Sequence, residues 1–336
     1  MHHPRDIGPR PDIRRRAVLA GLAGGLAAAS LARDARAQAR YPERPVTVIV
    51  TYGAGGAVDT VARVVFAKLS ERMGQPFVVE NRPGGGGTIG AAATARARPD
   101  GLTLMDDASG FAINPALRPR LPYDAGRDFL PIVRIAAVPN TIVAGPACPA
   151  RTLADLIALA RSRPDDLDCA TTGTGSSQHL TLELFNRLAG VRINHVPYRD
   201  TPAAQNDVLA GRIALYCATA TSAAPHHNQG GLRVLAHTGH KPVEALPGVP
   251  AASATLPGFE GLEWHGLFAP RGTPDEVVRR LNAEVNAALR DPEVLARLSG
   301  LAAQAEANTP EQFQAFVASE IEKWGRVARE ASISLD

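Results

Sequence analysis

The sequence has few cysteines, few aromatic residues and no long hydrophobic run beyond its first 39 residues. It contains 3 cysteines and 5% aromatic residues in a chain of 336 residues. So few cysteines exclude a disulfide-rich scaffold. The frequencies of glycine and proline are too low for a collagen-like chain. Because no run after residue 39 approaches the roughly 20 apolar residues that span a bilayer, the sequence predicts no transmembrane helix there.

Charge of one sign is also lacking once the N-terminus is set aside. The formal net charge of the whole chain is +3. Residues 1–39 contain seven arginines and three aspartates, which leaves 29 basic and 30 acidic residues in the remainder. A nearly neutral body has no basic surface of the kind that binds phosphate backbones. We therefore expect no nucleic-acid partner.

The N-terminal segment has the pattern of an export signal. Three arginines at 14–16 precede a short apolar stretch at 17–32, and an A-x-A motif follows at 37–39. These are the basic, apolar and cleavage regions of a signal peptide, and the last two arginines resemble a twin-arginine signal. A membrane anchor is less favoured because the apolar stretch is short. We expect residues 1–39 to be a cleaved signal peptide, with 35–37 as an alternative cleavage motif, and the mature protein to be periplasmic.

The three cysteines, Cys148, Cys169 and Cys217, form an odd set in an oxidising compartment. One disulfide with one free thiol is possible, and spacing does not determine its connectivity. The simpler alternative is that all three are small buried apolar residues.

Strand and helix patterns alternate along the mature chain, which indicates an α/β fold built from βαβ units with parallel sheets. The predicted strands are 45–50, 76–80, 102–106, 132–145, 167–173, 193–198, 212–218 and 232–238. The clearest predicted helices are 58–74, 88–98, 152–163, 176–190, 201–211, 273–290 and 309–330. Pro139 is expected to break the long extended segment, and the chain after 238 is expected to be mostly helical. Extended crossings near 134–140 and 236–240 would join two domains.

Two glycine-rich loops connect a predicted strand to a predicted helix. The first, TYGAGGAVD at 51–59, is called loop one, and the other, ATTGTGSSQHL at 170–180, is called loop three. Amides at a helix N-terminus lack partners within the helix and lie at the positive end of its dipole, so each loop is a candidate anion site. Neither loop contains Arg or Lys, which predicts that backbone amides and hydroxyls hold the anion. Neither sequence matches a P-loop or a G-x-S-x-G nucleophile motif.

A further glycine-rich loop between these two, NRPGGGGTIG at 81–90 (loop two), raises an enzyme hypothesis. Gly85, Gly87 and Gly90 match G-x-G-x-x-G, and Asp106 or Asp107 follows about 20 residues later, as in dinucleotide-binding proteins. The motif follows the second predicted strand and not the first, however, so a turn that brings a helix close to the sheet is preferred.

Several segments together resemble one known family. They are YPERPVTVIV with GG and Asp (41–59), QPFVVENRPGGGGTIGA (75–91), PDGLTLMD (99–106), INPAL…LPYD…DF.PI (113–132), ATTGTGSSQHL (170–180), HVPYRDTPAAQNDVLAGRI (195–213), SAAPH (222–226) and LFAPRGTPDEVVRRLN (267–282). In this order they resemble the periplasmic solute-binding proteins of tripartite tricarboxylate transporters, the Bug or TctC-like family. The resemblance covers nearly the whole mature chain.

The resemblance implies a fold and a division into domains. The fold is a two-lobed, type II, Venus-flytrap-like α/β binding protein with two parallel-rich sheets joined by crossover strands. Lobe 1 is expected at 40–138 plus 237–336, and lobe 2 at 139–236. No catalytic residue, metal or cofactor is expected, and the protein is expected to be a monomer.

The resemblance also implies a binding site. The two loops at 52–59 and 171–179 would hold a small organic carboxylate between the lobes, and the protein would deliver it to membrane subunits of the TctA and TctB type. The expected ligand-binding residues are Tyr52, Gly53, Ala54, Gly55, Gly56, Asp59, Ser109, Thr171, Thr172, Gly173, Thr174, Ser176, Ser177, His179, Ala218 and Thr219.

The sequence departs from the family in ways that affect the ligand. Ala218 and Thr219 replace an Asp-Asn pair that is common in the family, which argues against an amino-acid ligand because its ammonium group would lack a counter-ion. Arg199 could approach a carboxylate or could be a solvated loop residue. The alternative function is an exported hydrolase that uses Ser176 or Ser177 with His179, although no orienting acid is identifiable.

Overall fold

The computed structural model describes residues 41–199 and 201–335, and residues 44–336 form one unit. The predicted signal peptide at 1–39 lies outside the described residues. Among the helices that the structure describes, none has the length and apolarity needed to cross a bilayer.

The first group of strands is a parallel βαβ arrangement. Strand β1 (Val46–Val50) lies between β2 (Phe77–Asn81) and β3 (Thr103–Ala108), and both pairings are parallel. Helix α2 (Ala57–Met73) connects β1 to β2, and α3 (Thr88–Ala95) lies between β2 and β3. The 3-10 turn Gly85–Gly87 precedes α3, and α4 (Gly110–Leu117) follows β3.

The second group repeats the arrangement further along the chain. Strand β5 (Asp168–Thr171) pairs in parallel with β6 (Asn194–Pro197) and β7 (Leu215–Thr219). The other elements of this region are α5 (Leu153–Ser162), α6 (Ser177–Ala189), α7 (Thr201–Leu209), α8 (Ala220–Asn228) and β8 (Arg233–His237). Helix α5 begins at the predicted capping box, because Thr152 and Asp155 exchange side-chain to backbone hydrogen bonds.

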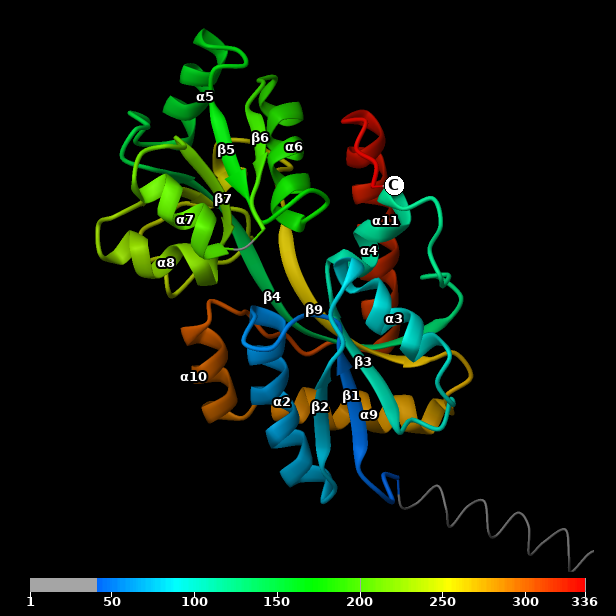
Figure 1. Ribbon diagram of the computed structural model, residues 1–336. Coiled ribbons are helices and arrows are strands. Elements are labelled where there is room, and N and C mark those ends of the chain that lie inside the picture. The colour runs from blue at the N-terminus through cyan, green and yellow to red at the C-terminus, as the bar shows by residue number, and fades with distance from the viewer. Residues whose placement is uncertain (1–40, 200, 336) are drawn as a thin grey trace, which may run out of the picture. The chain divides into compact units, whose positions relative to one another are not determined.

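Two antiparallel strands join these groups, and in the described part of the chain every antiparallel pairing involves one of them. Strand β4 (Phe129–Ala144) pairs with β9 (Leu262–Pro270) along 129–139 and with β7 and β8 along 140–144. Strand β9 also pairs with β3. The strands therefore form one hydrogen-bonded path in which β4 passes from the first group to the second (Figure 1).

Two predictions about this junction were wrong. Strand β4 continues through Pro139, which pairs with Leu262 at the point where β4 changes partners. The missing N–H of Pro139 is tolerated there because the hydrogen-bond ladder with β9 ends at this residue and the ladder with β7 begins at the next one. The second error is β9, which lies in a segment expected to be helical. Its apolar pattern of Leu, Trp, Phe and Ala is interrupted by Gly266. The lobe boundaries at 138 and 237 stay predictions.

The C-terminal helices pack against strand β4 at the junction and against helices α2, α4 and α6. They are α9 (Asp275–Ala288), α10 (Pro292–Gly300) and α11 (Pro310–Glu330). A capping box between Thr309 and Gln312 begins α11, which contacts α4, α6, α9 and β4. Both tryptophans are buried, and the indole N–H groups of Trp264 and Trp324 donate to Glu320 at 3.1 and 2.9 Å. Both are thus packing residues.

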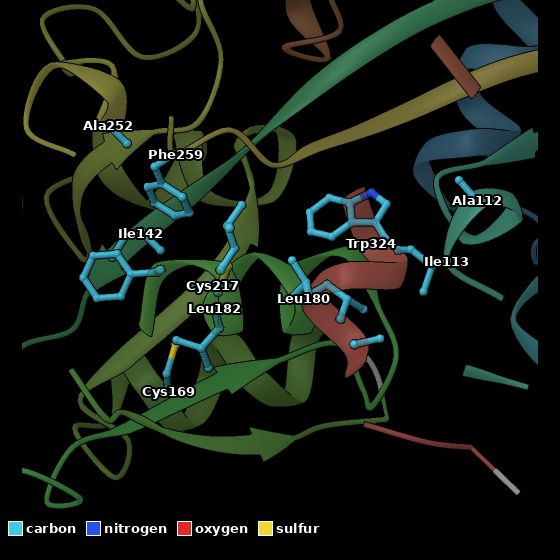
Figure 2. Close-up of a cluster of buried hydrophobic side chains, with 14 of the residues drawn as sticks. Ala112, Ile113, Ile142, Cys169, Leu180, Leu182, Cys217, Ala252, Phe259 and Trp324 are labelled. Atoms are coloured by element: carbon cyan, nitrogen blue, oxygen red, sulfur yellow. The ribbon is translucent and has the colours of Figure 1, made fainter. Parts of the chain in front are cut away.

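The buried core is continuous across the junction. One cluster includes Ile142 on β4, Leu180 on α6 and Trp324 on α11, and Figure 2 shows part of it. The three cysteines are buried and unpaired, and two of them, Cys169 and Cys217, belong to the part shown in the figure. This agrees with the simpler interpretation of the cysteines as small apolar residues.

Candidate functional site

A cavity of about 1080 Å³ lies where the two groups of strands meet. Its wall includes residues 52–58 of loop one and residues 172 and 174–178 of loop three. Residues of α4 with the flanking Ser109 and Arg118, and residues at the start of α8, complete this part of the wall. Residues 263 and 265 of β9 and residue 138 of β4 also line it. Segments far apart in the sequence thus face one space of the size that small-molecule sites occupy.

Loop one forms a tight turn at the start of α2. The Gly56 amide donates to the Gly53 carbonyl at 3.3 Å, and Gly55 has φ of 79°. This is the pattern of a type II turn, whose third residue requires a positive φ. The Gly55 amide donates to Asp59 Oδ2 at 2.8 Å. A carboxylate in the first turn of α2 therefore holds the turn in place.

Loop three repeats this geometry at the start of α6. The Ser176 amide donates to the Gly173 carbonyl at 3.2 Å, and Gly175 has φ of 78°. The Gly175 amide donates to Nδ1 of His179 at 3.1 Å. The acceptor is again four residues after the glycine and in the first turn of the helix. The two loops are equivalent turns, and each presents a helix N-terminus to the cavity.

Asp59 is held by several donors. Arg63 Nε and Asn81 Nδ2 donate to it at 3.0 and 2.9 Å, in addition to the Gly55 amide. Burial acts to raise the pKa of Asp59, but the hydrogen bonds from Arg63, Gly55 and Asn81 outweigh it and lower the pKa to about 2. Asn81 also donates to the Tyr52 carbonyl at 3.0 Å. Asp59 is therefore ionised at neutral pH and fixes the backbone of loop one.

His179 is held by its neighbours as a neutral acceptor. Its ring stacks on the ring of His195 with 3.6 Å between the ring centroids, and Thr171 Oγ1 lies 2.6 Å from His195 Nε2. Burial lowers the pKa of His179 to about 3, with a contribution from His195, and burial lowers the pKa of His195 to about 4. An uncharged His179 ring can accept the Gly175 amide at Nδ1.

This geometry contradicts the hydrolase alternative. The Ser176 hydroxyl oxygen accepts the His179 backbone amide at 3.1 Å, as a helix N-cap. Nδ1 of His179 accepts an amide proton, and its Nε2 lies 3.7 Å from Glu183. The Ser177 hydroxyl oxygen, in turn, accepts from Asn140 Nδ2 at 3.0 Å. Neither serine hydroxyl therefore pairs with the imidazole ring as a nucleophile with its base.

A buried asparagine anchors loop three to the junction. Asn140 lies on β4, and its Nδ2 donates to the hydroxyls of Ser177 and Thr181 at 3.0 and 2.9 Å. Its Oδ1 accepts from Gln178 Nε2 at 3.2 Å. All three partners lie in the first turns of α6. The N-terminus of α6 is therefore fixed directly to the strand that crosses between the two groups.

The predicted site residues divide into a lining set and a supporting set. Those that line the cavity are Tyr52, Gly53, Ala54, Gly55, Gly56, Ser109, Thr172, Thr174, Ser176, Ser177 and Thr219. Those outside the lining are Asp59, Thr171, Gly173, His179 and Ala218. Asp59 and His179 hold the loops, and Ala218 is a buried residue of β7 that accepts the Thr141 hydroxyl. The assignment of these residues to ligand binding stays a prediction.

The structure adds charged residues to the cavity wall. Arg118 follows α4, and its Nε donates to Asn114 at 3.2 Å; Arg199, left open by the sequence, also lines the cavity. Glu263 and His265 enter from β9. Sequence reasoning missed these last two because it did not identify β9. The alternating pattern around Trp264 was the available signal.

The dinucleotide motif has another role in this fold. Gly90 lies where α3 approaches β1, and a Cβ there would come within 2.8 Å of the Thr51 side chain. Asp106 and Asp107 are fully buried in β3, and Asp107 accepts the Thr51 hydroxyl at 2.6 Å. The loop is therefore the close helix-to-sheet turn that was preferred for this sequence.

The fold and the site define an α/β binding protein with its cavity between two groups of strands. The model of the tripartite tricarboxylate transporter family receptor, TctC, matches residues 61–333. The chain therefore belongs to this family, whose members are solute-binding receptors and not enzymes.

Similar proteins support the assignment. The chain is 39% identical over 318 residues to a UPF0065 protein in the tcbD–tcbE intergenic region of Pseudomonas sp. (strain P51), with 94% of each chain covered. It is 36% identical to R. palustris Rpa4515 solved with adipate, with a TM-score of 0.78 and coverage of 88% and 99%. It is 35% identical to MatC of Rhodopseudomonas palustris with bound malate, with a TM-score of 0.73, and the match covers 85% of this chain and 99% of MatC. These likenesses confirm the predicted α/β periplasmic binding-protein fold.

Proposed function

We propose that this receptor is periplasmic, binds a small organic carboxylate in the cavity, and delivers it to TctA- and TctB-type subunits of a membrane transporter. The observation that carries the proposal is the pair of equivalent turns, which places the N-termini of α2 and α6 at one cavity. The family description supports the transporter partner. Adipate and malate in similar structures support the class of ligand.

The chemistry of the cavity wall suits a carboxylate. Each helix N-terminus carries a partial positive charge, and each contributes about 0.3–1 kcal/mol to a nearby anion, more where water is excluded. Thr174 and Ser176 add hydroxyl donors in loop three, and Arg118 and Arg199 add full positive charges. The turns are already held by Asp59 and His179. Ligand binding then loses little conformational entropy from ordering these loops.

A thermal-shift screen of the purified protein tests this function. Organic acids of different length, including adipate and malate, would be compared with their uncharged amides. We expect at least one acid to raise the melting temperature and its amide to have no effect. At 100 times Kd, the ligand adds about 2.7 kcal/mol to the free energy of unfolding. If every acid behaves like its amide, the carboxylate proposal is wrong.

A further inference from the structure

Strand β9 contributes a polar pair to the floor of the cavity. Glu263 and His265 both line it, whereas the intervening Trp264 donates to Glu320 of α11. Alternate residues of a strand point to opposite faces, so Glu263 and His265 share the face that meets the cavity. Glu263 pairs with Val138 of β4, which lines the same space.

Within the part of the chain that the structure describes, His265 has no hydrogen-bond partner. Its side chain is 0% exposed to bulk solvent, and both ring nitrogens lack a partner. Burial lowers the pKa of His265 to about 4, so the ring is neutral at physiological pH and offers one donor and one acceptor. A buried polar group without a partner costs free energy unless a ligand or water satisfies it. His265 is therefore available to a group that enters the cavity.

Glu263 lies between the two halves of the site, beside Ser109 and Ser177. Burial raises the pKa of Glu263, and the hydroxyls of Ser177 and Ser109 with the Ser109 amide oppose the rise. The charged group that acts on its pKa is Glu320, which raises it further. Burial also raises the pKa of Asp107 to about 7, with a contribution from Glu263. Glu263 is thus the acidic side chain that β9 contributes to the cavity wall, beside the neutral ring of His265.

Together, the carboxyl oxygens of Glu263 and the unprotonated nitrogen of His265 offer hydrogen-bond acceptors to a group that enters the cavity. A carboxylate of the ligand placed beside Glu263 would put two acidic groups together in a poorly solvated site, where ionisation of both is disfavoured. An N–H or O–H group would instead donate to the acceptor nitrogen of His265, which has no partner among the described residues, and to the Glu263 carboxyl group.

We propose that Glu263 and His265 determine specificity by selecting carboxylates that carry a hydrogen-bond donor, an amine or hydroxyl, at the end remote from the bound carboxylate. The inference rests on the proposed function, since loops one and three must hold the carboxylate end. It also revises the interpretation of Ala218 and Thr219: the acid missing from β7 is supplied by Glu263 from β9.

Calorimetric titration with matched ligands tests the proposal. The probes are adipate, 6-aminohexanoate and 6-hydroxyhexanoate, with succinate and 4-aminobutanoate as a shorter pair. For wild type we expect the amino acid to bind at least about tenfold more tightly than the diacid in one of the two pairs, with the hydroxy acid between them. Glu263→Gln should reduce this ratio by about tenfold or more, because the amide retains the shape but presents an NH2 donor in place of one carboxyl oxygen.

Two further variants complete the test. Glu260→Gln changes a nearby residue that pairs with His240 outside the cavity, and it should leave the ratio unchanged. His265→Asn should lower the ratio as Glu263→Gln does. If circular dichroism shows that Glu263→Gln is unfolded, His265→Asn replaces it in the test. A preference for the diacids that neither variant alters would overturn the role of Glu263 and His265 but keep the carboxylate receptor. Failure of every carboxylate to bind would overturn both.

Discussion

At the scale of single residues, two different side chains do the same work in the two loops. Asp59 and His179 each accept the amide of a positive-φ glycine four residues earlier. The first is an ionised carboxylate and the second a neutral imidazole, which gives the loops different responses to acid. Neither side chain lines the cavity, so both act on a ligand through the backbone they hold.

Asp59→Asn should remove stability in a pH-dependent way. The pKa of Asp59 falls from 3.8 to about 2 on folding, so its contribution is full above pH 3.8 and is lost as the pH falls towards 2. The difference corresponds to about 2 kcal/mol. We expect the variant to be less stable than wild type by about this amount at pH 7, and the gap to narrow below pH 4. Urea unfolding at pH 7, 4.5 and 3 measures it.

Glu71→Gln is a suitable control because Glu71 is an exposed residue of the same helix. It should show almost no gap at any of these pH values. A gap for Asp59→Asn that stays constant from pH 7 to 3 would show that the carboxylate charge does not stabilise loop one.

At the scale of elements, the site depends on how α2 and α6 begin. Each helix follows a four-residue turn whose third residue is a glycine with positive φ. The turn determines where the free amides of the helix point. Neighbouring elements fix each turn from behind: Asn81 of β2 through Asp59, and Asn140 of β4 through α6.

Gly55→Ala should weaken loop one, whereas Gly53→Ala should not. A Cβ at either position would meet no atom within 4 Å, but only Gly55 has a positive φ. The two variants therefore separate backbone strain from steric contact. We expect Gly55→Ala to lose about 1–2 kcal/mol of stability and to bind the screened carboxylate roughly tenfold more weakly.

Denaturant unfolding and calorimetric titration of both variants check this prediction. Equal stability of Gly55→Ala and Gly53→Ala would mean that the turn accepts an alanine without strain, and the proposed rigidity of loop one would be wrong.

At the scale of the whole molecule, β4 and β9 connect the two groups of strands, and the cavity lies at their junction (Figure 1). The proposed lobes, 40–138 with 237–336 and 139–236, would move about these strands. Closing them would bring the two turns together around the carboxylate and exclude water, which strengthens each electrostatic contact.

Spin labels can measure this motion. Cysteines introduced at the exposed positions Glu71 and Arg163 would label the two proposed lobes, and a Glu71 and Arg98 pair would label one lobe only. Burial raises the pKa of Cys148, Cys169 and Cys217, so these native thiols should not react. On addition of a carboxylate, double electron–electron resonance should show a shorter distance for the first pair.

The second pair should show no change, because both labels lie in the same proposed lobe. Unchanged distances in both pairs with ligand bound would argue against closure about β4 and β9. A change in both would place the moving boundary elsewhere in the chain.

The sequence by itself determined the local structure and the family. Hydrophobic periodicity and capping signals located most elements, such as α5 with its Thr152 cap, because these patterns depend on neighbouring residues. The glycines of loops one and three indicated tight turns for the same reason, and ordered motifs pointed to the receptor family that the comparisons confirm.

Only the tertiary structure decided what faces the cavity. Strand β9 contains Gly266, and it is stabilised by β3 and β4, which are more than 100 residues away in sequence. Its strand conformation, and therefore the position of Glu263 and His265, depends on those long-range partners. The same holds for Asp59 and His179, whose roles depend on which way each side chain turns. Local sequence does not encode such contacts, because their free energy comes from packing between distant segments.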